Sequence, residues 1–294
     1  MRQGRPEAGF TLVELLMAVA ITVVIAAIMV SVTVTTLSVW RKAQDSFTTD
    51  ATAQLIFDFL ERDLQGAIVR RDNNIWLTCE TFDDDLVNHD WLVATTMKPA
   101  GGTYVPADSV IGEARFSRSG HWFRFFTTSG VGPISVSYQI VRSSTSSATS
   151  PDPESIRYSL FRETSTASTT FATGYDVTQF DALIKPSSSH NAGTNVIDFG
   201  VWFYRTEPDG ELRRIFPQTN GEAFILTQSD VIDAVDAMVR VLTDEGAAKI
   251  SAIERGLVSI PSEFEGDADA WWWSVADAHS KVYVRRMRLK TKAW

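Results

Sequence analysis

The chain has 294 residues, which is enough for one or two domains with a hydrophobic core. Hydrophobic residues make up 44% of it and charged residues 21%, which excludes collagen-like, disulfide-scaffold and wholly disordered chains. The formal net charge of -9 argues against a nucleic-acid partner, because phosphates attract a basic surface. The single cysteine, Cys79, cannot form an internal disulfide and is expected to be a small buried apolar residue.

The N-terminal part is far more apolar than the rest of the chain. Between residues 10 and 40 the only formally charged side chain is Glu14. About 20 such residues cross the apolar core of a bilayer as a helix. A cleaved secretory signal does not fit, because its apolar stretch spans only roughly 7 to 15 residues and an A-x-A-like cleavage site follows it. A plain membrane anchor fits the length, but it leaves the costly acid at position 14 unexplained.

Residues 9–14, which read GFTLVE, resemble the class III signal of type IV prepilins and pseudopilins. The resemblance implies that a membrane peptidase cleaves after Gly9 and that Phe10, the new first residue, is N-methylated. Glu14 is then the fifth residue of the mature chain. By the same resemblance, Glu14 pairs with the N-terminal amine of an adjacent subunit during filament assembly. An acid in apolar surroundings needs such a partner.

After Trp40 the sequence becomes amphipathic. Apolar residues recur every four positions at Phe47, Ala51, Leu55 and Phe59, which is typical of a helix with one buried face. The pattern predicts one helix over residues 11–69. The resemblance implies the lollipop layout of pilins, an α+β fold in which a long hydrophobic-then-amphipathic helix packs on an antiparallel β-sheet domain.

The predicted organisation has four parts. They are the prepilin leader (1–9), a transmembrane or filament-core helix (10–40), the amphipathic half of that helix (41–70) and one exported globular β-rich domain (71–294).

Short β-branched or aromatic runs bounded by turn residues predict strands in the last part. These runs are residues 75–77, 91–93, 121–126, 134–141, 156–161 and 196–204. Alternation along residues 134–141 predicts a half-buried strand. Pro208-Asp209-Gly210 predicts a hairpin turn before a strand over 212–216.

The remaining sequence gives weaker signals. Residues 231–242 fit either a strand or a helix. A closing strand over residues 282–289, with interleaved basic residues, is expected at an exposed sheet edge. Two serine- and threonine-rich runs, 142–155 and 164–173, are predicted loops.

Within the prepilin class, the chain is most similar to the J-type minor pseudopilins of type II secretion. Its size, the FLERDL segment at 59–64 and the strand pair 135–140 and 156–162 carry this resemblance. It implies a structural subunit, not an enzyme, which assembles at or near the tip of the pseudopilus and initiates the filament that drives protein export. The Ser/Thr insertions do not fit the pattern, and they leave open a divergent pilin-like lineage.

The resemblance also implies partners and a location. The partners are prepilin peptidase, other minor and major pseudopilins, the inner-membrane assembly platform, and membrane lipid before assembly. The protein would be single-pass in the bacterial inner membrane, with the leader in the cytoplasm and the C-terminal domain in the periplasm. The alternative is a minor pilin of a type IV pilus, acting as an adhesin or DNA-uptake module, although the acidic charge argues against DNA.

No catalytic, metal or cofactor site is predicted. The sequence has no phosphate loop, nucleophile elbow or H-E-x-x-H motif. Its four histidines, His89, His121, His190 and His279, are scattered without ligand spacing. The acidic run 83–85 lacks the alternate spacing of a calcium loop and is expected to be solvated.

Three consecutive tryptophans, Trp271, Trp272 and Trp273, cannot all face one side of a strand. At least one ring is therefore expected to reach the surface or a neighbouring subunit, where aromatic residues are common in interfaces. The alternative is core packing with one incidental exposure.

Overall fold

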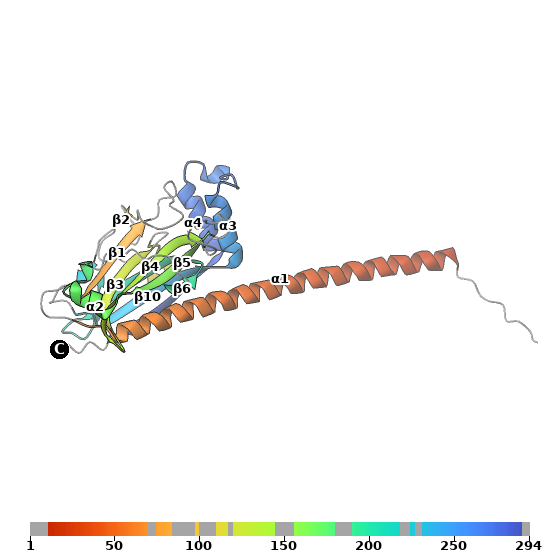
Figure 1. Cartoon of the computed structure of the whole chain (residues 1–294). Helices are drawn as coiled ribbons and strands as arrows, with labels where there is room; N and C mark the ends of the chain where they lie inside the picture. Colours follow the sequence, from red (N-terminus) through yellow and green to blue (C-terminus); the bar gives the residue numbers. More distant parts are fainter. Residues whose placement is uncertain are drawn as a thin grey trace, which may run out of the picture. The chain divides into compact units, whose positions relative to one another are not determined.

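The structure is a computed structural model that describes residues 11–69, 75–83, 98–99, 110–116, 120–144, 156–179, 190–217, 224–226 and 231–289. The chain divides into two compact units, Met1–Phe47 and Thr48–Trp294. Figure 1 shows the elements in sequence colours. The domain boundaries at residues 9, 40 and 70 stay predictions.

Helix α1 (Leu12–Gln65) confirms the predicted long helix. No proline or glycine interrupts it, and the chain turns at Gly66 immediately after its last residue. A side chain at Gly66 would place its Cβ 2.7 Å from the hydroxyl of Thr127, so only glycine fits where the chain leaves the helix. Within the second unit, α1 buries one face, which includes Ala53, Ile56 and Leu60.

The second unit contains two antiparallel sheets, whereas the sequence predicted one. The first has the order β2-β1-β3-β4-β5-β6, and β9 also pairs with β1. Its strands are β1 (Leu77–Asp83), β2 (Lys98–Pro99), β3 (His121–Ser129), β4 (Gly132–Ser144), β5 (Ile156–Thr164), β6 (Asn191–Thr194) and β9 (Phe224–Leu226). The second has the order β11-β10-β7-β8. Its strands are β7 (Val196–Thr206), β8 (Leu212–Phe216), β10 (Ala234–Leu242) and β11 (Ser280–Arg288).

The remaining elements are short helices. Three are α-helices, α2 (Ala167–Ala172), α3 (Asp244–Glu254) and α4 (Ala268–Ala278). The 3-10 turns within the described residues are η1 (Ile111–Glu113), η3 (Val177–Gln179) and η5 (Ser262–Phe264). The predicted α+β class, with a long apolar helix followed by antiparallel sheets, is confirmed.

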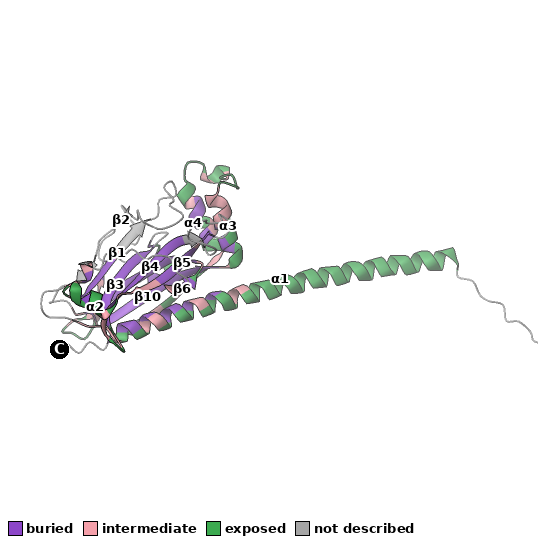
Figure 2. Cartoon of the chain, viewed as in Figure 1, coloured by how far each residue is buried: buried purple, intermediate pink, exposed green. Residues whose placement is uncertain are grey.

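The core lies between the two sheets, whose aromatic side chains meet. The ring centroids of Phe123 on β3 and Phe203 on β7 lie 5.5 Å apart. Part of α1 lies along the edge strands of both sheets, because Ile56 contacts Gly193 on β6 and Asp58 pairs with Arg285 on β11. Figure 2 shows the buried strands of this unit in purple. The helix therefore covers one edge of each sheet, at β6 and at β11.

The predicted hairpin is confirmed, since β8 pairs with β7 around Gly210, whose φ is 85°. Residues 234–242 form strand β10, which pairs with β7 on one side and β11 on the other. All nine of its residues are buried, including Asp236 and Arg240, which pair with Arg286 and Asp277. These two polar residues are four positions apart, a spacing that also fits one face of a helix, so the sequence did not distinguish a strand from a helix. Strand β11 is at a sheet edge as predicted, but this edge is not free, because Tyr283 and Arg285 bond to Thr49 and Asp58 of α1.

Two other predictions differ from the structure. Strand β4 is not half-buried, because Ser137 and Gln139 are buried as well as the apolar residues between them. The hydroxyl of Ser137 accepts a hydrogen bond from Trp122 Nε1 at 2.8 Å, which lowers the cost of burying that face. The run 164–173 is not all loop, because it contains α2, which is capped by Thr166.

The boundaries of some strands also differ from those predicted. The strand expected at 75–77 begins at Leu77, and β4 extends to Ser144, into the predicted loop 142–155. Residues 145–155 and the strand predicted at 91–93 lie outside the described residues. Cys79 is fully buried as expected, and burial raises the pKa of its thiol.

Candidate functional site

The first turn of α1 carries the predicted assembly residue Glu14. Gly9 and Phe10, the predicted cleavage and methylation positions, lie outside the described residues. Thr11 precedes the helix and forms a reciprocal capping box with Glu14. The carboxylate accepts hydrogen bonds from the backbone N–H of Thr11 at 2.9 Å and from its hydroxyl at 3.0 Å, while that hydroxyl accepts from the Glu14 N–H at 3.3 Å.

This capping role was not inferred from the sequence, although the T-x-x-E spacing at 11–14 is its usual signature. The acid also lies where the partial positive charge of the helix N-terminus favours it. Glu14 therefore caps its own helix in the single chain. A test of its role in assembly must distinguish the loss of this cap from the loss of a contact between subunits.

Beyond the cap, the surface of α1 is apolar and exposed. Apolar side chains from Leu12 to Trp40 are at least half exposed, and an 18-residue window of the helix reaches a mean hydropathy of 2.9. Residues 12–40 extend about 43 Å as a helix, more than the roughly 30 Å core of a bilayer. This helix is long and apolar enough to cross a membrane.

Five of the six hydroxyls in residues 12–40, all except that of Ser31, bond to the helix's own carbonyls. Those of Thr22, Thr33 and Thr36 donate to the carbonyl four residues earlier, each at 2.8 Å. Thr35 and Ser38 donate to carbonyls four and three residues earlier, at 2.9 Å and 2.8 Å. A polar group inside a bilayer has no water to bond, so these internal hydrogen bonds lower the cost of placing the helix in lipid.

The tryptophan run lies elsewhere, on helix α4, and not on a strand as expected. Trp271, Trp272 and Trp273 are all buried, at 7%, 0% and 6% exposure. The prediction that at least one ring reaches the surface is therefore wrong. The helix places the rings on different neighbours: Trp272 Nε1 donates to Glu254 at 3.0 Å, while Trp273 lies under the guanidinium of Arg115.

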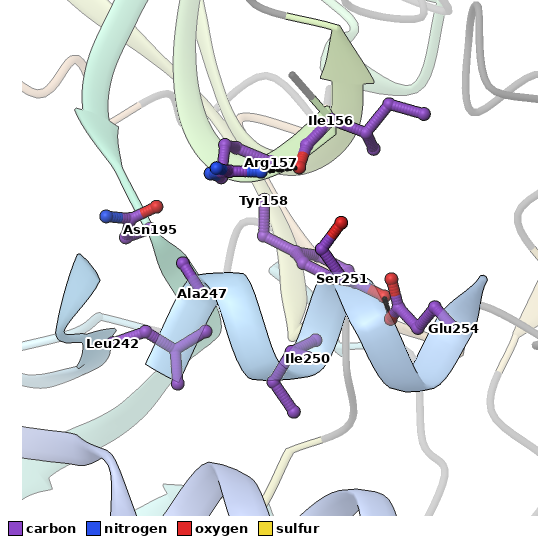
Figure 3. Close-up of a pocket in the computed structure, with 9 residues that line it drawn as sticks. All are labelled: Ile156, Arg157, Tyr158, Asn195, Leu242, Ala247, Ile250, Ser251 and Glu254. Carbon is purple, nitrogen blue, oxygen red and sulfur yellow. Dashed lines mark hydrogen bonds between the residues drawn. The ribbon is translucent and has the colours of Figure 1, made fainter. Parts of the chain in front are cut away.

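A small pocket lies where β5 faces α3. Figure 3 shows Arg157 and Asn195 on one side, and Ser251 and Glu254 of α3 on the other. The enclosed space is only about 10 Å³, room for about one water molecule and far below the roughly 300 to 1,000 Å³ of typical ligand sites. Glu254 is already engaged, because it pairs with the guanidinium of Arg142 and accepts from Trp272.

A buried polar cluster surrounds the ring of Phe116. Asp198 on β7 is fully buried and accepts a hydrogen bond from the Phe116 N–H at 3.0 Å, and burial raises its pKa to about 7. His121 on β3 is also fully buried, with its ring 4.5 Å from that of Phe116. Its Nδ1 accepts from the Val201 N–H at 3.0 Å, and burial lowers its pKa to about 3.

The other polar residues singled out from the sequence are dispersed. His190 contacts Glu163 at 2.7 Å and His279 contacts Lys249 at 2.8 Å, while His89 lies outside the described residues. Within the described ranges, no group of three His, Cys, Asp or Glu side chains is placed to hold a metal ion.

The acidic run 83–85 also falls largely outside the described residues, and Glu80 beside it pairs with Arg124 at 2.5 Å.

Residues 4–30 match the family model described as the prokaryotic N-terminal methylation motif. The matched segment contains Gly9, Phe10, Glu14 and the first part of the exposed apolar helix. It supports the resemblance to type IV prepilins and pilins, and points to a structural protein processed by a prepilin peptidase. Neither a curated protein nor a solved structure matches the chain.

Proposed function

We propose that this chain is a structural minor pseudopilin of a type II secretion pseudopilus, similar to the J-type subunits. It would assemble with other minor and major pseudopilins at or near the filament tip and initiate polymerisation. The methylation motif over residues 4–30, continuous with an exposed apolar helix, is the observation that carries the proposal. The J-type assignment rests on the similarity of segments 59–64, 135–140 and 156–162.

The leader, residues 1–9, would remain in the cytoplasm until a prepilin peptidase cleaves after Gly9. Residues 10–40 would cross the inner membrane and later enter the filament core, and residues 41–70 would continue as the amphipathic half of the helix. Residues 71–294 would form the periplasmic domain. Support for the span comes from the apolar surface of residues 12–40, which ends where the polar sequence begins at Arg41. Basic residues do not decide the orientation, because Arg2 and Arg5 on one side are balanced by Arg41 and Lys42 on the other. The short leader and the large C-terminal part favour export of the latter.

Cleavage would create a new amine on Phe10, next to the capping box. In lipid, the positive amine and the carboxylate of Glu14 are each costly unless paired. Pairing across two subunits would satisfy both and would fix how far one helix is displaced along the next. The assembly platform and the membrane lipid are the partners that this route requires before the filament forms.

The primary test is the intact mass and the N-terminal peptide of the full chain co-expressed with a prepilin peptidase. The expected product begins at Phe10 and carries one added methyl group. Gly9→Val should block cleavage, whereas Gly4→Val, a matched change within the leader, should leave it unaffected. An uncleaved wild-type chain, or one cut beyond Ala20, would overturn the proposal.

A second measurement separates export from pilus formation. Deletion of the gene should abolish secretion of the cargo of the cell's type II system and leave pilus-dependent motility intact. The reverse result would favour a pilin role.

A further inference from the structure

The connection between α3 and α4, residues 256–267, presents apolar side chains to solvent. Leu257, Val258 and Ile260 are 63%, 48% and 45% exposed. Helices α3 and α4 pack against one another, and the connection that joins them lies at their exposed end (Figures 1 and 2). Isolated exposed apolar residues are common on protein surfaces, but three within four positions form a continuous apolar tip.

The backbone of the connection is held at its start by the end of α3. Gly256, with a φ of 66°, donates to Ile253 O at 2.9 Å, and Leu257 donates to Ala252 O at 2.9 Å. These two hydrogen bonds form a Schellman motif. In such motifs an apolar residue at the Leu257 position commonly packs back on the helix, yet here it is mostly exposed.

The far end of the connection is also fixed by hydrogen bonds. The N–H of Phe264 donates to Pro261 O at 2.9 Å, and that of Asp267 donates to Phe264 O at 2.9 Å. The Asp267 carboxylate then caps α4 through the Ala270 N–H at 2.8 Å. Because the backbone is already ordered, a partner that binds the tip loses less conformational entropy than one that must order a loop.

The charge around the tip is predominantly negative, although Arg255 directly precedes it. Residues 256–270 contain four acidic side chains and no basic one: Glu263, Glu265, Asp267 and Asp269. A membrane surface is disfavoured as the occupant, since anionic lipid would repel these carboxylates. A protein surface that combines apolar and basic side chains matches both features of the tip.

We infer that the α3–α4 connection is a docking surface for another protein, whose contacting segment is apolar and basic. Leu257, Val258 and Ile260 would be covered by apolar side chains, and Glu263 and Glu265 would face lysine or arginine residues at the rim. This surface is distinct from residues 4–30, which carry the proposed function. It could therefore operate in a pilus or a pseudopilus.

The test uses the full chain in uncharged detergent micelles and a fluorescent amphipathic helical peptide made of leucine and lysine. Binding is followed by fluorescence anisotropy, with empty micelles as the blank. The peptide should bind the wild-type chain. The triple variant Leu257→Ser, Val258→Ser, Ile260→Ser and the double variant Glu263→Lys, Glu265→Lys should each weaken binding about tenfold or more. Circular dichroism checks that each variant is folded.

Two controls distinguish binding at this surface from non-specific binding, either to exposed apolar residues or to the acidic protein as a whole. Val131→Ser removes an apolar side chain that is 84% exposed on the β3–β4 turn, and it should leave the affinity unchanged. A leucine–glutamate peptide of the same length should bind at least tenfold more weakly than the leucine–lysine peptide. Equal binding by wild type and both variants, or no binding to the wild type at millimolar peptide, would overturn the inference.

Two other outcomes would also overturn it by naming a different occupant. One is self-association of the full chain that the triple variant abolishes. The other is binding of the tip to phosphatidylglycerol vesicles.

Discussion

Asp63 in the last turn of α1 and Arg162 on β5 form a two-pronged ion pair across the second unit, with Oδ2 2.6 Å from Nε and Oδ1 2.9 Å from Nη2. The same carboxylate accepts from the hydroxyl of Tyr138 on β4 at 2.5 Å. Asp63 is 4% exposed, so the group is removed from solvent and fully dependent on these partners. The pair ties the end of α1 to the seven-stranded sheet.

Asp63→Ala should lower the free energy of unfolding by about 3 kcal/mol, because it leaves a largely buried guanidinium and a phenol without their acceptor. Urea unfolding of the full chain in micelles, followed by tryptophan fluorescence, measures this change. Arg213→Gln is the matched control. It breaks the exposed pair with Asp209 and should cost less than about 1 kcal/mol. Equal costs for the two variants would refute the structural role of Asp63.

Asp198 and His121 give opposite pH dependences that cancel in the wild-type chain. Near pH 5 the folded chain holds one proton on Asp198, whose pKa is about 7, and none on His121, whose pKa is about 3. The unfolded chain holds none on Asp198 and one on His121, since their ordinary pKa values are 3.8 and 6.5. Both states bind one proton, so this pair adds no pH slope to stability there.

Removing either group should reveal the pH dependence of stability that the other group causes. In Asp198→Asn the unfolded chain binds the extra proton on His121, so relative to wild type its stability should rise by about 1.4 kcal/mol per pH unit between about pH 4.5 and 6. In His121→Asn the folded chain binds the extra proton on Asp198, so its stability should fall with pH at a similar rate. Urea titrations at three pH values test this. Parallel profiles for wild type and both variants would contradict these two pKa shifts.

Glu14 has two separable properties, its charge and its ability to accept the capping hydrogen bonds. Glu14→Gln keeps an acceptor for the Thr11 N–H but removes the charge, whereas Glu14→Leu removes both. Membrane insertion should be retained in both variants, because each makes the segment less costly in lipid. Incorporation into filaments should fall in both, which fractionation and filament assays can measure.

Thr11→Ala is the complementary control, since it weakens the cap and keeps the charge. It should assemble better than Glu14→Gln. Normal assembly of Glu14→Gln would mean that the cap, and not the charge, is the property that matters.

The tryptophan run should contribute to stability through its central ring. Trp272 is fully buried, contacts Tyr158 with ring centroids 6.1 Å apart, and donates to Glu254. Trp272→Ala should therefore cost about 3 to 5 kcal/mol, and Trp272→Phe less, because the latter keeps most of the apolar volume. Val131→Ser, at an exposed turn, should be close to neutral. Near-neutral behaviour of Trp272→Ala would show that the ring is not part of the core.

Local patterns predicted some features of the fold well. Helix α1 followed from the absence of proline and glycine and from its four-residue repeat. Strand β10 could not be separated from a helix, because it is buried on both faces and its two polar residues, Asp236 and Arg240, are spaced four apart as on a helix. Helix α4 was missed because three aromatic residues favour a strand by composition, although Asp267 and the alanines around the run are typical of a capped helix.

Among the functional and structural polar residues, those marked by a local motif were predicted and those paired across the fold were not. Glu14 and its neighbours were found from a contiguous motif, and Thr11 could have been found from its spacing to Glu14. Asp63 and Arg162, by contrast, are 99 residues apart, and nothing local marks them as partners. Their pairing depends on how the sheets and the helix come together, which is a property of the whole domain.

The locally bonded hydroxyls of α1 affect the cost of moving this helix from lipid into contact with other protein helices. Thr22, Thr33, Thr35, Thr36 and Ser38 each direct their proton to a carbonyl of the same helix. A neighbouring acyl chain and a neighbouring protein helix therefore meet the same non-donating surface. Exchange of an acyl chain for a protein helix requires no polar bond at these five positions to be broken or replaced, so the polar cost of such a transfer is confined to Ser31 and to the ends of the segment.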